Sequence, residues 1–533
     1  MNKTLKAKSR SLFGVLDTTK ILLSAIFISL VIIPLLVMFS NMDMDSIQRV
    51  LNTPNFKDIV VNSLTVGGVA TAISVIGGYL LARAVHRSGV KGKELFGMLF
   101  TVPMLVPSIS LGMGLIMLLG NNGIITKLLG LEKGIYGMWG IILGSVLYSL
   151  PVAYLMFSDI LKYEDASPYE AAKILGISKL RQFRIITLPY LKKPLISIIF
   201  AIFTLIVTDY GVPTAVGGVY KTIPVLMYEE VVGNLDFGKG AVLGAFLLIP
   251  ALIAFIFDLT NKDTGNNTWV TRQFDESKSL AEKTIAYALC IFAAVFTVSP
   301  AISFVLLSFT KGYPNDITLT FDNIVSVMDK AASFLGNSVV IAAFVALFGC
   351  VIAFLSAYLS ARMKSPSSKF LHLSSVTSAA IPGLVLGLSY AMTFSGTGIY
   401  NTLIILVMVN TVHFISSPYL MMYNSFSKLN MNLESVGDTL GISRVKMLKD
   451  VFLPQSLTTL LEMFSYFFVN CMMTISAVSF LSSTKTMPVS LLINQYQALS
   501  KPEFSAVVSM MILLINVAVK CIFKIIKNKA IKK

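Results

Sequence analysis

Residues capable of catalysis are few in this chain and lie far apart. Its three histidines are His86, His372 and His413, which share no short segment. This spacing indicates neither a catalytic nor a metal-binding cluster. A phosphate-binding Gly-x-x-x-x-Gly-Lys-Ser/Thr sequence does not occur, since the nearest stretch, residues 89–94, has the wrong spacing and ends in an acid. We therefore assign the chain no enzyme activity, no catalytic residue, no metal site and no bound cofactor.

A polar, basic block occurs once in each half of the otherwise apolar sequence. Its glycine and proline landmarks, Gly176 with Pro189 and Gly441 with Pro454, are repeated 265 residues apart in a chain of 533. The first copy carries Glu170, Ala171, Ala172, Gly176, Leu188 and Pro189. The second copy keeps Gly441, Leu453 and Pro454, but reads Ser435-Val436-Gly437 at the Glu-Ala-Ala position, with Glu434 one residue early. Two such elements facing one aqueous compartment predict a two-fold docking site.

The first block has the local signals of a helix-turn-helix. Residues 167–170 read as a capping box, with serine as N-cap and glutamate at the third helical position. Gly176 permits a sharp turn, and a short basic helix from Ser178 should stop before Pro189. In the second copy Gly437 should weaken the first helix by about 1 kcal/mol relative to alanine. The alternative interpretation is a basic loop held near lipid headgroups.

Four polar residues are candidates for a solute path. An aspartate facing lipid costs about 2.5 to 3.5 kcal/mol at the bilayer centre, so Asp209 should face a cavity or a neighbouring helix. At the offset of 265, Asp209 corresponds to Thr474. We hypothesise that Asp209 and Tyr210 line the path opposite Asn470 and Thr474. The alternative is that Asp209 only caps the segment around Pro213.

The elements that position these residues are membrane spans. A hydrophobic fraction of 55%, a charged fraction of 13% and a mean hydropathy of +0.77 exclude an ordinary soluble domain. Stretches of about 20 apolar residues predict six spans in the first half, at 20–40, 60–85, 98–119, 138–160, 190–218 and 241–260. The second half gives 284–309, 335–361, 370–394, 402–424, 455–481 and 505–526.

The distribution of basic residues predicts the orientation. Segments on the side of the N-terminus hold 33 of the 43 lysines and arginines, which places both termini in the cytoplasm. The net charge of +16 follows from this bias and implies no nucleic-acid partner. The run 21–39 is too long for a signal-peptide core, so a retained first helix is expected. We thus expect a multi-pass protein of the cell membrane.

An even number of spans per half makes the repeat parallel, not inverted. Asn62-Ser63 opens the second span as Asn337-Ser338 opens the eighth. We expect a first half at 1–260 with its block at 163–189, a cytoplasmic linker at 261–283, and a second half at 284–533 with its block at 428–454.

The block resembles the EAA loop of binding-protein-dependent ABC importer permeases, and the match runs over nearly the whole chain. The segments 209–213 and 217–220 are similar to a signature of the branch that carries ferric iron or 2-aminoethylphosphonate, with Tyr210 in place of phenylalanine. The resemblance implies an all-α membrane protein of twelve transmembrane helices, in two parallel six-helix repeats, each with a cytoplasmic EAA-type coupling helix. It also implies two copies of an ATP-binding subunit, which hold the ATP and Mg, and an extracellular solute-binding protein.

The resulting expectation is the permease subunit of an ABC importer for ferric iron or 2-aminoethylphosphonate, with thiamine or a polyamine as alternative cargo. The rival is a secondary transporter driven by an ion gradient, which would favour paired charges inside the membrane. Such charges are sparse here, and Glu462 is expected to pair with a lysine near the inner face.

Overall fold

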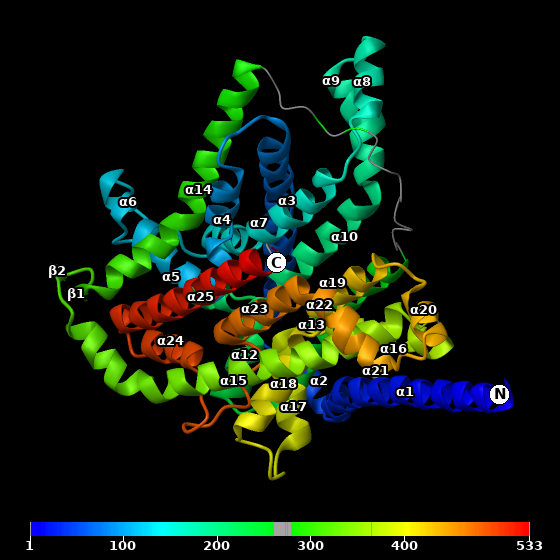
Figure 1. Ribbon diagram of the computed structural model, residues 1–533. Coiled ribbons are helices and arrows are strands. Elements are labelled where there is room, and N and C mark those ends of the chain that lie inside the picture. The colour runs from blue at the N-terminus through cyan, green and yellow to red at the C-terminus, as the bar shows by residue number, and fades with distance from the viewer. Residues whose placement is uncertain (1, 261–271, 273, 275–278, 364, 532–533) are drawn as a thin grey trace.

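The computed structural model describes residues 2–260, 272, 274, 279–363 and 365–531. Most of the predicted linker 261–283 therefore lies outside the described residues. Within them the chain is almost entirely helical (Figure 1). One departure from the all-α expectation is a small antiparallel hairpin of β1 (Thr310–Gly312) and β2 (Asp316–Leu319).

Among the described residues, nine helices are long and apolar enough to cross a membrane, or eleven if each of two bent pairs counts as one span. Seven helices run through most of a predicted span: α1 (Asn2–Ser40), α3 (Phe56–Arg87), α7 (Met138–Lys162), α13 (Phe237–Thr260), α14 (Leu280–Ser308), α15 (Asp322–Ala361) and α25 (Pro502–Ile531). The fifth predicted span corresponds to α10 (Leu188–Val207), followed by the short α11 (Gly211–Val216).

Several predicted spans are broken, and proline accounts for three of the breaks. The third is divided into α4 (Lys93–Phe100), a 3-10 turn (Val102–Leu105) and α5 (Ser108–Leu119). The ninth consists of α16 (Pro366–Thr377) and α17 (Gly383–Phe394), bent by 102°. Pro107 and Pro382 precede α5 and α17. Val106 and Ile381, directly before these prolines, have extended backbone, because proline disfavours the helical conformation of the residue before it. The tenth bends by 51° between α18 (Leu403–Phe414) and α19 (Ser416–Ser427), near Pro418.

The eleventh predicted span is shorter than expected. α23 (Leu457–Met473) has 17 residues, and the chain then leaves the helix until α24 (Val489–Ala498). Thr474 takes an extended conformation at the end of α23. The sequence 474–481 is apolar enough to look like a continued span, but hydropathy does not report the direction of the backbone.

The two halves are built alike. α3 packs on α7 and α10, and α15 packs correspondingly on α19 and α23. Asn62 and Asn337 donate from Nδ2 to the carbonyls of Lys221 and Lys485, at 3.1 and 2.8 Å. The following serines, Ser63 and Ser338, likewise accept backbone N–H groups from the opening residues of α12 (Ile223–Tyr228) and α24. The repeated Asn-Ser pairs, which indicated a duplication in the sequence, thus form the same contacts in both halves.

Each half also covers the other with its first helix. α1 packs on α16 and α17 of the second half, whereas α14 packs on α3, α4 and α5 of the first. Tyr390 donates to the carbonyl of Leu30 at 2.9 Å, and Thr297 donates to that of Leu99 at 3.1 Å. Because the exchange is reciprocal, the halves form one interlocked bundle.

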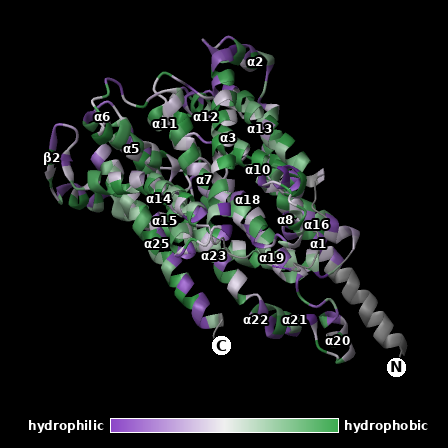
Figure 2. Cartoon of the chain, turned by 90° about the horizontal axis from the view of Figure 1, so that it is seen from above, coloured by the Kyte–Doolittle hydropathy of each residue, from purple (hydrophilic) through white to green (hydrophobic). Residues whose placement is uncertain are grey.

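The last residues of α3 and α15 lie at the same end of this bundle, which we call the basic end. Lys524 near the end of α25 lies 3.8 Å from Glu94, shortly after α3, and Lys527 pairs with Glu462 early in α23. The expected partner of Glu462 is thus a lysine, as predicted. Lys20 of α1 bonds to Ser365, just after α15. Figure 2 shows α20 (Leu433–Thr439), α21 (Arg444–Met447) and α22 (Leu453–Gln455) on the side opposite α2 (Met44–Leu51) and β2.

Candidate functional site

The first block forms a helix-turn-helix at the basic end. α8 (Ser167–Ile174) leads to a turn in which Gly176 has φ +68°, and α9 (Lys179–Gln182) follows. The predicted stop before Pro189 is wrong, because α9 continues through a widened π turn (Phe183–Thr187) into α10. Proline has no backbone N–H, and the wide turn before Pro189 accommodates the missing hydrogen bond.

The predicted capping box is also wrong. Ser167 is the first residue of α8 and not its cap, and its hydroxyl donates to Asp165 Oδ1 at 2.8 Å. Asp165 also accepts the Ser167 N–H at 3.1 Å, so an acid just upstream takes the role that sequence analysis gave to the serine. Glu170 does not turn back to the helix start and instead pairs with Arg272 Nη1 at 2.6 Å.

The second block repeats this geometry at the same offset. α20 leads to Gly441, also at φ +68°, then to α21 and a π turn at Leu448–Phe452. The packing of α20 on α21 requires glycine at position 437, since a Cβ atom there would lie 2.2 Å from Met447 Sδ. The glycine that was expected only to weaken α20 allows α21 to approach it closely. We call residues 163–189 the first loop and 428–454 the second loop.

An arginine at the end of a long helix holds each loop. Arg87 at the end of α3 pairs with Glu164, and its guanidinium lies 4.1 Å from the ring centroid of Phe274. Arg362, directly after α15, binds both carboxylate oxygens of Glu434, at 2.7 and 2.6 Å. Glu434 is therefore a buried anchor, whereas Glu170 stays partly exposed, with 40% of its side chain accessible.

The remaining predicted loop residues occupy equivalent places. Ala172 is buried and Ala171 is exposed, and the Leu-Pro pairs at 188–189 and 453–454 open α10 and α22 on the surface. Sequence analysis missed two apolar pairs at the loop tips. Leu175 and Leu440 are 74% and 68% exposed, and the equivalent Leu180 and Val445 are 65% and 76% exposed. The signal was available, since apolar residues in a charged loop at the repeat offset call for an explanation.

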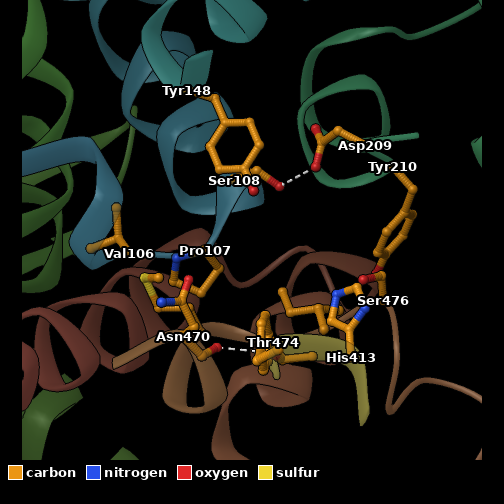
Figure 3. A pocket seen from close by; sticks show the side chains of 13 residues that line it. Val106, Pro107, Ser108, Tyr148, Asp209, Tyr210, His413, Asn470, Thr474 and Ser476 are labelled. Carbon is orange, nitrogen blue, oxygen red and sulfur yellow. Dashed lines mark hydrogen bonds between the residues drawn. The ribbon is translucent and has the colours of Figure 1, made fainter. Parts of the chain in front are cut away.

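A second feature is a cavity of about 110 Å³ between the halves. All four predicted path residues line it: Asp209, Tyr210, Asn470 and Thr474. Figure 3 shows Asp209 and Tyr210 on one side, with Asn470 and Thr474 facing them. The sequence hypothesis thus brought together residues more than 260 positions apart. Sequence analysis did not place Ser108, Tyr148, His413 and Ser476 in this cavity wall.

Asp209 makes the predicted capping contact and also lines the cavity, and its role in a solute path stays a prediction. One carboxylate oxygen accepts from Ser108 Oγ at 2.6 Å, and the other accepts the Val212 N–H at 3.0 Å, which caps α11. The same side chain lines the cavity. Tyr210 is 2% exposed, stacks on Tyr228 with ring centroids 4.8 Å apart, and bonds to Asn494 of the second half. The first-half wall is therefore rigidly positioned.

Two equivalent contacts in the cavity wall, one in each half, pair a serine with a glycine in opposite positions. A Cβ atom on Gly211 would lie 2.2 Å from Ser108 Oγ, and one on Gly383 would lie 2.4 Å from Ser476 Oγ. The first half thus has serine as the first residue of α5 and glycine as the first residue of α11. The second half has glycine as the first residue of α17 and serine in the segment after α23. In each half one serine side chain lies against a glycine, so the two wall segments of that half can approach closely.

No group of three histidine, cysteine, aspartate or glutamate side chains close enough to hold a metal ion occurs in the described part of the chain. All four cysteines are free, and three of them are buried, as expected of apolar packing residues.

Two like helical bundles that enclose one polar cavity define a polytopic membrane transport protein. Segments 74–261 and 347–532 each match the family described as binding-protein-dependent transport system inner membrane component, and the chain belongs to this family. It is a permease component in which the family's domain occurs twice within one polypeptide. This domain is the membrane component of the transport system and is not an ATPase.

Curated relatives agree with this assignment. The chain is 26% identical to the ferric transport system permease protein of Actinobacillus pleuropneumoniae over 83% of its own length and 67% of that protein. It is 23% identical to an Fe(3+)-transport system permease protein of Haemophilus influenzae, over 82% and 83% of the two chains. Similarity to the thiamine transport system permease protein of the same organism is 24%, over 64% of each. The fused ferric-type permease architecture is thereby confirmed.

Proposed function

We propose that this chain is the permease subunit of an importer powered by ATP that two separate ATP-binding subunits hydrolyse. The observation that carries the proposal is the pair of matching loops at one end of the bundle, each with an exposed apolar tip. Exposed apolar patches rimmed by charge are typical of protein-docking surfaces. Two equivalent tips favour two equivalent partners. Attraction to lipid headgroups alone would require only the lysines and arginines.

In this proposal the basic end faces the cytoplasm, together with both termini. Twelve crossings result when each bent pair and the short α23 count as spans, in two halves at 1–260 and 284–533 joined by a cytoplasmic linker at 261–283. The lipid bilayer surrounds the exposed apolar faces of helices such as α1 and α13. The extracellular solute-binding protein would deliver cargo at the end that carries α2 and the hairpin.

Motion would pass from the ATP-binding subunits to the cavity through the loop anchors. Closure of those subunits presses on α8 and α20, and the pairs Arg87–Glu164 and Arg362–Glu434 carry the displacement to α3 and α15. α3 and α15 pack on α7, α10, α19 and α23. Because α7 and α23 contribute Tyr148 and Asn470 to the cavity wall, a shift of these helices opens the cavity toward either side.

The cargo we propose is ferric iron or 2-aminoethylphosphonate, with thiamine or a polyamine as the alternatives. The similarity to permeases of ferric and thiamine transport systems supports the ferric iron and thiamine members of this range. The ion-driven alternative is disfavoured because Glu462 is paired with Lys527 at the basic end and is not available in the cavity. Asp209 is the one acid among the described lining residues.

Co-purification with the ATP-binding subunit tests the proposal. The complex should form, and its ATP hydrolysis should rise when a loaded solute-binding protein is added. Glu170→Ala and Gly176→Val should weaken subunit binding without lowering permease expression. If the wild-type permease neither retains the subunit nor stimulates its ATPase, the ABC assignment of mechanism is wrong and an ion gradient becomes the better explanation.

A further inference from the structure

His413 is a polar side chain in the cavity wall that neither the loops nor the predicted path uses. It lies on α18 of the second half and lines the cavity beside Ser476 (Figure 3). Its Nδ1 atom is shielded from solvent and has no hydrogen-bond partner. A buried polar atom without a partner costs about 1 to 3 kcal/mol. Because the nitrogen is closed off in this state, a solute in the cavity would reach it only when the wall opens or the ring turns, as the import cycle proposed above requires.

The neighbouring backbone leaves room for the imidazole. A Cβ atom on Gly383 would lie 3.2 Å from His413 Nε2, so any larger residue would press on the ring. Gly383 is also the position where Ser476 approaches the wall. The absence of a side chain at Gly383 thus makes room for both Ser476 and His413, which line the cavity. The position of this glycine at the start of α17 limits where the imidazole ring can lie.

The duplication gives His413 a counterpart. Tyr148 on α7 lies at the equivalent position, 265 residues earlier, and also lines the cavity. Asp209 and Thr474 are the second pair related by this offset. The first half thus supplies a phenol and a carboxylate, and the second half supplies an imidazole and a hydroxyl. The four groups surround the cavity from both halves.

The charge of the cavity selects among solutes. Asp209 is the one acidic residue among the described lining residues, which include no lysine or arginine. Its described bonds go to the Ser108 hydroxyl and the Val212 N–H, both neutral donors. A buried carboxylate without a counter-charge is stabilised by a cation and destabilised by an anion. The cavity therefore suits a cationic solute better than a phosphonate.

We infer that His413 is a cargo-contacting residue that determines specificity, and that with Asp209 and Tyr148 it selects a small cation. The inference rests on the proposed import function, because it takes the cavity as the route. Carboxylate and imidazole side chains are established donors to metal cations, and the Tyr148 hydroxyl adds a neutral oxygen beside them. A cavity of about 110 Å³ is large enough for more than one water molecule, so it has room for a metal ion with part of its hydration shell.

Uptake by proteoliposomes that contain the permease, its ATP-binding subunit and external solute-binding protein tests this inference. The probes are radiolabelled ferric iron, thiamine and 2-aminoethylphosphonate, each loaded on the solute-binding protein. His413→Gln should lower ferric uptake about tenfold, the loss expected for one strong polar contact, mainly through a higher KM. His413→Lys should abolish it, because the added charge repels a cation. His372→Gln is the matched control, since His372 bonds to Tyr419 outside the cavity, and its uptake should be unchanged.

Subunit binding and ATP hydrolysis, measured on the same preparations, separate a failure of the His413 inference from a failure of the proposed import function. Variants that assemble and hydrolyse ATP normally but lose uptake support the inference. Normal uptake by both His413 variants, or a wild-type protein that transports 2-aminoethylphosphonate and neither cation, would overturn it while leaving the import function intact. A wild-type complex without any ATP-driven uptake of the three probes removes the import function, and the inference with it.

Discussion

Arg362 holds Glu434 through two parallel contacts, Nε to Oε1 at 2.7 Å and Nη2 to Oε2 at 2.6 Å. The same guanidinium donates to the carbonyls of Leu429 and Asn430, at 2.8 and 2.6 Å. These carbonyls lie between α19 and α20. One side chain at the end of α15 therefore contacts both the entry to the second loop and its first helix, and ties this loop to α15.

Arg362→Ala should detach the second loop from α15. Breaking a buried ion pair by removing one partner costs about 3 to 5 kcal/mol, because the remaining charge stays buried. We expect ATP hydrolysis by the assembled complex to continue with much less transport per ATP. The ratio of uptake to hydrolysis in proteoliposomes measures this effect.

Two further variants give this prediction its controls. Glu434→Arg combined with Arg362→Glu should recover part of the coupling, since the pair is restored in reverse. Lys524→Ala removes the exposed pair with Glu94, outside both loops, and should change little, because exposed pairs contribute about 0 to 1 kcal/mol. An unchanged coupling ratio in Arg362→Ala would show that α15 does not transmit the motion.

Gly176→Ala and Gly441→Ala should each impair docking of an ATP-binding subunit. Both glycines have φ +68°, where an L-residue costs roughly 1 to 2 kcal/mol, so the turn would relax and α9 or α21 would change direction. Gly336→Ala is the matched control, because Gly336 lies in α15 with ordinary φ and open space around its Cβ position. Pull-down of the subunit should weaken for the two loop variants only. Equal retention by all three would contradict a docking role for the turns.

Leu175→Asp and Leu440→Asp test the exposed loop tips. The two leucines are 74% and 68% exposed, so folding should tolerate the change, whereas a burying interface should not. Each leucine buried at an interface contributes about 1.5 to 3 kcal/mol, and the double variant should lose the ATP-binding subunit altogether. Leu128→Asp on α6 (Ile124–Leu128), 81% exposed away from the loops, serves as control. Retention of the subunit by the double variant would favour the lipid-headgroup interpretation.

The loops show how far the sequence could lead. Gly176 and Gly441 with their following prolines are local signals, since positive φ and a missing N–H depend on the residue itself. They predicted the helix-turn-helix correctly in both copies. The capping box failed because Asp165, three residues before the motif's proline, competes for the same donors. Glu434 was read as a counterpart of Glu170, but its burial depends on Arg362, which is 72 residues away and invisible to a local motif.

The cavity shows the same division. The high cost of an acid in a membrane singled out Asp209, and the repeat offset singled out Thr474. His413 could have been found in the same way, as the counterpart of Tyr148, but neither residue carries a charge that draws attention. The breaks at α16 and α17 and after α23 escaped notice because hydropathy reports apolar composition and not backbone direction. The exchange of α1 and α14 between the halves depends on packing across the whole bundle.

Asp209→Asn should reduce uptake more than it reduces stimulated ATP hydrolysis. The amide keeps the size of the side chain and can still accept from Ser108 or from the Val212 N–H, so the cap of α11 is largely preserved while the charge is lost. Asp209→Ala removes both the charge and the cap, and should also lower thermal stability by about 0.5 to 2 kcal/mol, as for a lost N-cap. Comparing uptake and melting temperature for the two variants separates the path role from the capping role. Normal uptake by Asp209→Asn would leave only the capping role.

The serine and glycine exchange in the cavity wall yields a prediction that depends on the duplication. Gly383→Ser alone should destabilise the second half, because its Cβ would lie 2.4 Å from Ser476 Oγ, and the start of α17 would have to shift. Adding Ser476→Gly removes that hydroxyl and copies the first-half arrangement of Ser108 with Gly211. The double variant should therefore recover most of the melting temperature that the single variant loses, since contacting residues couple by about 0.5 to 3 kcal/mol. His413 shares the space beside Gly383, so the recovery should be incomplete. Strictly additive changes in melting temperature across the four proteins would show that the two wall segments are not in contact.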